Sequence, residues 1–242
     1  MLEGENQKAY KQGGVGQEAL EDLEEAYNIN AWIAGLFHQY LGEKNLELGA
    51  GTGTISNFIA KNTPLDLCEA SEACQKTLRQ RFPENKVYPD FYTIENQAAY
   101  DCIYSSNVLE HFADDVSAII QAEKLLKDGG YFVAYVPALQ SLYSDFDKMI
   151  GHFRRYNNNE IARIHQELSK QKSKMQIQSF QYFNPVGAMG WLVNMKWKKK
   201  RQIDKKDVVI YNKIFPFIRW TNLLSRIVKG QNMLIVFKKV DL

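Results

Sequence analysis

Apolar and polar residues alternate with two different periods between residues 45 and 138. Short apolar runs, which are typical of buried strands, lie at 45–48, 64–68, 86–90, 100–106 and 131–136. The segments between them have the period of amphipathic helices, one beginning near Ile55 and the others spanning 73–81 and 114–126. This alternation predicts a parallel sheet with right-handed crossovers and helices on both of its faces.

Further elements are predicted on both sides of this unit. Residues 18–41 have apolar residues at helical spacing and predict an N-terminal helix. Residues 175–180 and 233–240 predict two closing strands, and the aromatic and basic segment 185–230 between them is expected to form a helical cap over a substrate pocket. We expect Gly129-Gly130 to end the helix that precedes the fifth strand.

A glycine-rich turn follows the first predicted strand. Gly49, Gly51 and Gly53 stand in the order G-x-G-x-G, and Glu47 lies two positions before the first of them. Glycine allows a positive φ and lets a ligand approach the backbone closely. The dinucleotide fingerprint G-x-G-x-x-G would need its third glycine at position 54, which is Thr54. The turn therefore favours a nucleotide cofactor other than a nicotinamide dinucleotide.

A second acidic residue ends the second predicted strand. Glu69 lies about twenty residues after the first glycine, where a carboxylate can accept hydrogen bonds from both hydroxyls of a ribose. Ligands of open α/β sheets bind at the carboxyl ends of the strands, near the switch in strand order. We therefore expect the glycine turn, Glu69, Asp90 and residues 105–107 to share one rim of the sheet.

The order of these motifs resembles the class I S-adenosylmethionine (SAM)-dependent methyltransferases. The E-x-G-x-G-x-G run resembles motif I of that family, and residues 100–111, which end in N-V-L-E-H, resemble its motif IV. The resemblance covers roughly residues 20–160. It implies an α/β, Rossmann-like sheet of seven mostly parallel strands with an antiparallel last strand, SAM as the cofactor and S-adenosylhomocysteine (SAH) as the product. The cofactor-binding residues that it implies are Glu47, Gly49, Ala50, Gly51, Gly53, Glu69, Ala70, Asp90, Phe91, Ser106 and Asn107.

The centre of the N-terminal helix has the pattern N-x-N-x-W between Tyr27 and Trp32. This pattern resembles small methyltransferases of bacterial glycan, lipid or natural-product pathways, and it implies that Tyr27 or Trp32 covers the cofactor or contacts the substrate. The alternative interpretation is an ordinary helix that packs on the core.

Residues 145–156 follow the fifth strand, where substrate-binding loops of this fold emerge. Their G-H-x-R-R-Y string resembles the same group of enzymes. The resemblance implies that substrate is bound by Arg154, Arg155 and Tyr156, which offer two anion-binding guanidinium groups and a phenol. Alternatively, the two arginines pair with Asp145 and Asp147 and fix the loop.

Methyl transfer from SAM is an in-line displacement that positioning alone can accelerate strongly. A hydroxyl acceptor also gains from removal of its proton. His111 and His152 are the candidate bases, because the ordinary pKa of imidazole lies near neutrality. His111 has the alternative of a helix-packing histidine, and His38 and His165 fall on amphipathic helices where a structural role is expected.

Composition narrows the class of protein. The chain has 242 residues, of which 45% are hydrophobic, and a formal net charge of +2, which favours one domain with a sizeable core. Its three cysteines lack metal-ligand spacing and their odd number favours a reducing cytoplasm. Without a cluster of ligands in the sequence we expect no metal, and without a basic binding motif we expect no nucleic acid.

Charge is distributed unevenly. Residues 196–207 contain seven basic and two acidic residues next to two tryptophans. One interpretation is a solvated face of the protein. The other is that residues 191–206 touch an anionic membrane surface from the cytoplasm or a phosphorylated substrate. No apolar run approaches eighteen residues, so a membrane-spanning helix is not expected.

The sequence thus predicts methyl transfer from SAM to a small-molecule or glycan/lipid-linked acceptor, at oxygen. Two alternatives remain, a nicotinamide-dependent Rossmann oxidoreductase and a non-catalytic SAM-binding protein, because fold alone does not choose between them. We expect a single domain over 1–242, divided into an N-terminal helical segment (1–44), a SAM-binding core (45–138), a substrate-side loop (139–160), a cap (185–230) and a final strand (231–242).

Overall fold

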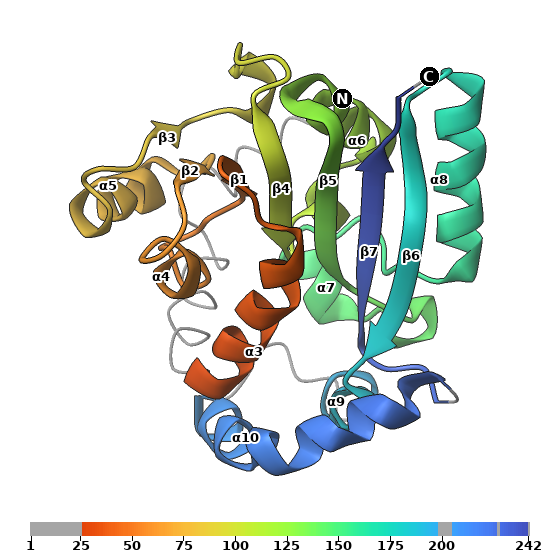
Figure 1. Ribbon diagram of the computed structural model, residues 1–242. Coiled ribbons are helices and arrows are strands. Elements are labelled where there is room, and N and C mark those ends of the chain that lie inside the picture. Colours follow the sequence, from red (N-terminus) through yellow and green to blue (C-terminus); the bar gives the residue numbers. More distant parts are fainter. Residues whose placement is uncertain (1–25, 198–204, 227, 242) are drawn as a thin grey trace.

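The computed structural model describes residues 26–197, 205–226 and 228–241. Seven strands form one sheet in the order β3-β2-β1-β4-β5-β7-β6 (Figure 1). The strands are β1 (Asn45–Leu48), β2 (Leu65–Cys68), β3 (Val87–Tyr88), β4 (Tyr100–Ser106), β5 (Leu126–Pro137), β6 (Met175–Phe183) and β7 (Asn232–Lys239). Adjacent strands from β3 to β5 pair in parallel, and β7 runs antiparallel between β5 and β6. The predicted fold class is confirmed.

Helices cover both faces and one end of the sheet (Figure 1). They are α3 (Tyr27–Phe37), α4 (Ser56–Ile59), α5 (Glu72–Arg81), α6 (Asp115–Leu125), α7 (Asp145–Met149), α8 (Asn158–Lys170), α9 (Pro185–Trp191) and α10 (Lys205–Ile218). A π-helical segment continues α9 over Leu192–Trp197, and a 3-10 helix continues α10 over Arg219–Arg226. The predicted N-terminal helix is described from Tyr27 onward, and its earlier part lies outside the described residues.

The predicted end of the third helix at Gly129-Gly130 is wrong. Helix α6 already ends at Leu125, and both glycines lie inside β5. Gly129 has a φ of 81°, and the pairing of β4 with β5 shifts in register between Tyr100 and Cys102. The glycine pair therefore forms an irregular start of the strand and does not cap the helix.

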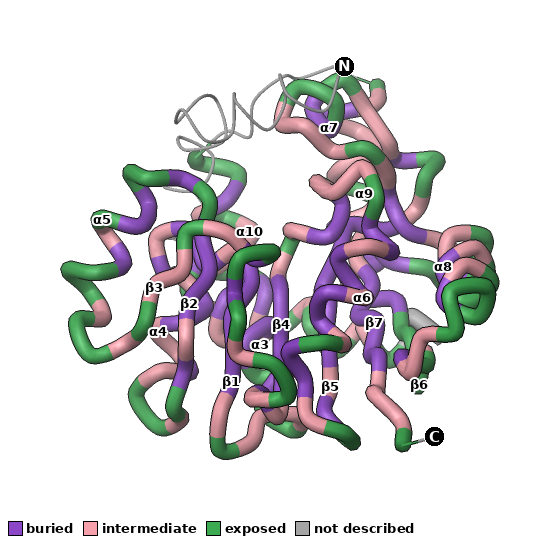
Figure 2. The backbone as a smooth tube through the Cα atoms, turned by 90° about the horizontal axis from the view of Figure 1, so that it is seen from above, coloured by how far each residue is buried: buried purple, intermediate pink, exposed green. Residues whose placement is uncertain are grey.

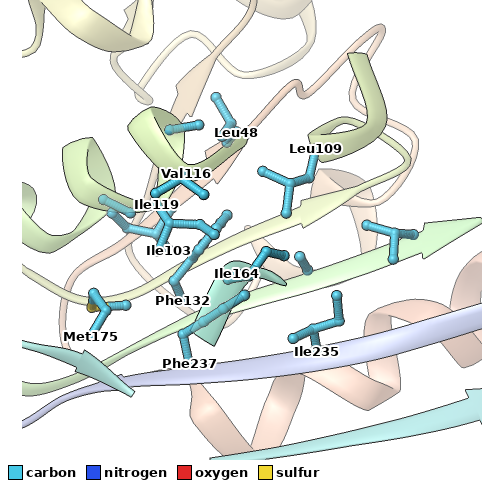
Figure 3. Packing of buried hydrophobic residues seen from close by; sticks show 14 of the residues in the cluster. Leu48, Ile103, Leu109, Val116, Ile119, Phe132, Ile164, Met175, Ile235 and Phe237 are labelled. Carbon is cyan, nitrogen blue, oxygen red and sulfur yellow. The ribbon is translucent and has the colours of Figure 1, made fainter. Parts of the chain in front are cut away.

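Successive residues of the central strands face opposite sides of the sheet, so each side has its own core. On one side, Ile103 of β4 belongs to a buried cluster with Ile119 of α6 and Ile164 of α8 (Figure 3). On the other side, the ring of Tyr104 stacks on Phe37 of α3, with 4.8 Å between ring centroids. Figure 2 shows that burial is concentrated along the strands and on the helix faces turned toward them. The core thereby holds the carboxyl ends of β1 and β4 in a fixed position.

Helices α3, α9 and α10 gather where the parallel strands end (Figure 1). Asn28 joins α3 to α10, because its backbone N–H donates to Asn212 Oδ1 at 2.8 Å and its side-chain amide donates to the Asn212 carbonyl at 3.0 Å. The order of the strands reverses between β1 and β4, and a crevice at such a switch is where ligands bind in this class of fold. Among the described residues, no helix combines the length and the apolar character that crossing a membrane requires.

Candidate active site

The glycine turn packs directly against the segment that follows β4. Gly49 has a φ of 72°, and a Cβ atom added there would lie 2.3 Å from Val108 Cγ2. No larger residue fits this contact. The backbone N–H groups of Gly49 and Ala50 both donate to the Cys68 carbonyl, at 2.8 and 3.1 Å, so the turn is anchored on β2 as well.

Glu47 is buried beneath the glycine turn. Its Oε2 accepts hydrogen bonds from Ser56 Oγ at 2.5 Å and from the Tyr104 hydroxyl at 3.0 Å. Burial raises the pKa of Glu47 to about 7, although both hydrogen bonds oppose the increase. The carboxyl group therefore connects β1, α4 and β4 around the turn, which agrees with the organising role that the family resemblance implies.

Glu69 binds the same turn from the side of β2. Its carboxylate accepts hydrogen bonds from the backbone N–H of Gly51 at 2.8 Å and of Ser71 at 2.7 Å. The side chain is buried, and burial raises its pKa. Each carboxylate oxygen has a second lone pair, so a ribose can share this group with the backbone. The ribose contact of Glu69 stays a prediction.

A cavity of about 450 Å³ opens beyond the carboxyl ends of β1 and β4. Nine of the predicted site residues line it: Glu47, Gly49, Ala50, Gly51, Ser106, Asn107, His111, His152 and Arg155. They come from the turn after β1, the segment after β4 and the loop after β5. The structure thus brings together three segments that are distant in sequence, as expected for a site at the switch in strand order.

Five of the predicted cofactor-binding residues do not line this cavity. Of the described residues, Gly53, Glu69, Ala70, Asp90 and Phe91 are not part of its lining. Asp90 Oδ1 accepts from the backbone N–H of Tyr92 at 2.8 Å, and Phe91 is buried in the core. Their cofactor roles stay predictions.

The N-x-N-x-W pattern contributes its asparagines to the site, and its aromatic residues lie elsewhere. Asn30 lines the cavity and Asn28 holds α10. Trp32 packs edge-on against Phe183 and Phe215, with ring centroids 5.3 and 5.4 Å apart. Trp32 is not among the described residues that line the cavity. This arrangement favours the interpretation of a helix that packs on the core.

The loop after β5 has a mostly structural hydrogen-bond pattern. Arg154 donates to the carbonyls of Phe112 and Ala113 at 2.7 and 2.6 Å. The Tyr156 hydroxyl donates to Asp115 Oδ2 at 3.0 Å, and the side chain is fully buried. Neither residue lines the cavity in the described part of the chain, so their predicted substrate contacts gain no support.

Arg155, by contrast, lies at the cavity although it is almost completely buried. Its Nε donates to Asp147 Oδ1 at 2.7 Å, and its guanidinium lies 4.5 Å from the ring centroid of Trp191 in the cap. The alternative in which an arginine pairs with Asp147 therefore holds for Arg155. This cation–π contact joins the loop to the cap.

The two candidate bases stand side by side. The rings of His111 and His152 meet edge to face, with centroids 4.6 Å apart. Burial and the neighbouring His152 lower the pKa of His111 to about 3, so His111 accepts a proton poorly near neutral pH. His152 Nδ1 lies 3.1 Å from Asp147 Oδ1. A carboxylate that orients an imidazole in this way is common in enzymes, so His152 is the better-placed base.

Several cavity residues were missed from the sequence. The cap contributes Trp191, Asn194, Met195, Val208 and Tyr211, and α3 contributes Ile29 and Ile33. Their contacts join segments more than 150 residues apart. The only signal in the sequence was the aromatic character of the segment 185–230.

Comparison with known proteins agrees with this site. Residues 46–132 match the family described as "Methyltransferase domain". This part of the chain is therefore similar to methyltransferase domains. The match supports the predicted class I SAM-dependent methyltransferase family and a SAM-dependent enzyme. A curated relative, an uncharacterized 37.1 kDa protein in transposon TN4556 of Streptomyces fradiae, is 29% identical over 114 residues, which are 43% of this chain. The match spans only 33% of that protein's length.

Solved structures share the fold at low sequence identity. A putative sarcosine dimethylglycine methyltransferase from Galdieria sulphuraria has a TM-score of 0.57 and 15% identity, with 88% of this chain and 86% of that chain covered. Geranyl diphosphate C-methyltransferase from Streptomyces coelicolor A3(2), in a complex with SAH, has a TM-score of 0.60 and 11% identity over 86% and 76% of the two chains. The [4+2]-cyclase SpnF has a TM-score of 0.57 and 12% identity over 87% and 80%. At these identities the likeness shows the fold alone.

Replacement of Glu47 by Gln should reduce the change in the free energy of unfolding with pH. The pKa of Glu47 is about 7 in the folded protein against an ordinary 4.5, so the folded state binds this proton more tightly than the unfolded state. The resulting stabilisation is complete below about pH 4.5 and is lost as the pH rises through 7. The loss is on the order of 3 kcal/mol.

Urea unfolding at pH 5 and pH 8 measures this effect. The difference between the two pH values should be smaller in Glu47→Gln than in the wild type, whereas the exposed control Glu43→Gln should behave as the wild type does. An equal difference in wild type and Glu47→Gln would show that Glu47 titrates normally.

Proposed function

We propose that this methyltransferase transfers the methyl group of SAM to a hydroxyl oxygen of a small-molecule or glycan/lipid-linked acceptor. The observation that carries the proposal is one cavity that extends from the glycine turn to His152, the partner of Asp147, and is lined in part by the cap. One end of it has the groups that suit the cofactor. The other end has a base and apolar walls that suit an acceptor.

The methionine part of SAM fits the end formed by the glycine turn. Gly49 and Gly51 leave room for close approach to the backbone, and Asn107 reaches the same space from the end of β4. Glu47 lines the cavity below them, so its carboxylate can balance the ammonium charge of the cofactor. Glu69 then lies on the ribose side.

The reaction at the other end needs a positioned hydroxyl. The acceptor oxygen attacks the methyl carbon, a C–O bond forms, and the C–S bond breaks with its electron pair moving to sulfur, which leaves SAH. The hydroxyl proton passes to His152 Nε2, while Asp147 holds Nδ1 of the same ring. Exclusion of water by the cap favours both steps.

The walls of the cap define the class of acceptor. Phe146, Trp191, Met195 and Val208 form an apolar surface, and Asn194 adds an amide. Aromatic rings with a few polar groups suit a sugar, an aromatic ring or an isoprenoid chain. The C-methyltransferase with a related fold acts on geranyl diphosphate, so carbon is the competing acceptor atom.

The outer face of the cap is unusually apolar and also basic. Its large exposed side chains are Met189, Trp197, Ile210, Ile214, Phe217, Trp220 and Leu223, and three of them are more than 70% exposed. Exposed lysines of α10, Lys205, Lys206 and Lys213, accompany them. Apolar anchors beside basic residues are typical of a surface that lies on an anionic membrane. Such contact would present a lipid-linked acceptor directly to the cavity below. Residues 198–204 of the predicted membrane segment lie outside the described residues.

Transfer itself is tested with methyl-labelled SAM and a panel of phenols, sugars and polyprenyl-linked sugars. We expect SAH formation together with label on an oxygen of one class of acceptor. His152→Ala should lower kcat at least tenfold, and the exposed control His38→Ala should not. Label on a carbon or nitrogen atom of the product would contradict methyl transfer to oxygen. If no compound of the panel led to formation of SAH, the proposed class of acceptor would be contradicted.

Loss of the Glu69 carboxylate should weaken cofactor binding. Hydrogen bonds to a charged group contribute about 1.5–3 kcal/mol each, so Glu69→Ala should lower the affinity for SAH by about 10- to 100-fold. The control Glu72→Ala, exposed in the first turn of α5, should bind as the wild type does. Calorimetry with SAH measures the affinity, and wild-type affinity in Glu69→Ala would refute the assignment.

Binding of the cap to membranes should depend on its exposed aromatic residues. Flotation with anionic vesicles should recover the wild type but not the Phe217→Ser/Trp220→Ser variant, because the variant has lost apolar anchors. Tyr92→Ser, which removes an exposed aromatic residue outside the cap, is the matched control and should float. Equal recovery of all three proteins, or of the wild type with neutral vesicles, would contradict membrane contact through the cap.

A further inference from the structure

Three side chains, two of which line the cavity, place metal-binding atoms close together. Glu110 and His111 belong to the 3-10 helix η3 (Leu109–His111), and His152 lies just after α7. One ligand atom from each lies within 4.8 Å of the other two. The spacing of residues in the sequence predicted no metal, because the third ligand is 41 positions away from the second.

Glu110 is the unusual member of this group. Its side chain is fully buried, and neither carboxylate oxygen has a hydrogen-bond partner among the described residues. Its nearest candidate partner is His152 Nε2, at 3.6 Å from Oε1, which is too long for a hydrogen bond. Burial of an unpartnered carboxyl is costly, and a cation between these two atoms would remove that cost.

His152 is oriented so that one ring nitrogen faces Glu110. Its Nδ1 is 3.1 Å from Asp147 Oδ1, and this hydrogen bond assigns the proton to Nδ1 and a lone pair to Nε2. Asp147 is itself fixed by Arg155 Nε at 2.7 Å and by Ser144 Oγ at 2.8 Å. Metal-binding histidines commonly donate their second N–H to a carboxylate in this way.

His111 completes the set from the cavity side. It lines the cavity together with His152, and its ring meets that of His152 edge to face. One of its ring nitrogens lies within 4.8 Å of the ligand atoms of Glu110 and His152. A neutral imidazole is the form that binds metal ions.

We propose that Glu110, His111 and His152 bind one divalent transition-metal ion, with Asp147 as a positioning residue for His152. Two nitrogens and one carboxylate oxygen suit Zn²⁺, Mn²⁺, Fe²⁺ or Co²⁺, whereas Mg²⁺ and Ca²⁺ prefer oxygen ligands alone. Ligands at about 2.1 Å from one tetrahedral ion lie about 3.4 Å apart. Glu110 Oε1 and His152 Nε2, at 3.6 Å, are already close to that separation, whereas a pair near the 4.8 Å limit of the group has to approach by about 1 Å. Three protein ligands leave coordination positions open toward the cavity.

The ion would lie at the acceptor end of the site. A hydroxyl oxygen that coordinates a divalent cation loses its proton more readily, which is what an oxygen acceptor requires before it attacks the methyl group. This catalytic role rests on the proposed function. Binding of the ion does not, because it depends only on the geometry of the three side chains. With the ion bound, His152 Nε2 is a ligand and cannot also accept the hydroxyl proton, which passes to solvent water, so the ion replaces His152 as the group that activates the hydroxyl.

Titration of untagged, chelator-treated protein with Co²⁺ tests the site without an acceptor. We expect visible d–d absorption that saturates at one ion per chain and is displaced by Zn²⁺, with Mg²⁺ ineffective. Glu110→Gln and His152→Gln should each bind Co²⁺ at least tenfold more weakly, and Asp147→Asn about 10- to 100-fold more weakly. His165→Gln, an exposed histidine on α8, is the matched control and should bind as the wild type does.

Circular dichroism and SAH titration of every variant separate the outcomes. Absence of Co²⁺ absorption in the wild type, or unchanged affinity in Glu110→Gln, overturns the metal site. If Glu110→Gln does not fold, the Co²⁺ affinity of His152→Gln is compared with that of the wild type instead. If neither variant folds, the same comparison is made with His111→Gln. SAH binding without metal binding contradicts only this proposal, whereas metal binding without SAH binding contradicts the proposed function.

Discussion

The contact between Gly49 and Val108 is the constraint on which the site depends. A Cβ atom at position 49 would lie 2.3 Å from a methyl group of Val108, so the turn after β1 and the segment after β4 can lie together only with glycine there. These two segments flank the switch in strand order and form the mouth of the cavity. Every ligand group on the cofactor side is positioned relative to this contact.

Three buried glutamates, Glu47, Glu69 and Glu110, lie in different environments. Glu47 is held by two hydroxyl donors and Glu69 by two backbone N–H groups, so both stabilise the turn that they support. Glu110 has no hydrogen-bond donor among the described residues. A carboxyl group that is buried without a partner usually has a role beyond packing, and this difference distinguishes the acceptor side of the site from the cofactor side.

The sequence predicted the fold and the position of the glycine turn at the ends of the strands because both depend on local patterns. Strand and helix periods, the glycine spacing and the position of Glu69 can be found within about 25 residues. The acceptor end depends on contacts between distant segments. Tyr156 bonds to Asp115, Asn28 to Asn212, and Arg155 lies against Trp191, so residue types suited to substrate binding are used to hold loops and helices together. The position of Gly129-Gly130 was misjudged for a related reason, since pairing with β4 determines where β5 begins.

The central claim is that the cavity beneath the glycine turn binds SAM, and calorimetry of the purified protein with SAM, SAH and NAD in parallel tests it most directly. The account predicts micromolar binding of SAM and SAH and no heat from NAD, because Thr54 stands where a dinucleotide site needs glycine. Binding of NAD without binding of SAM or SAH would contradict the account, since the glycine turn would then serve a different cofactor.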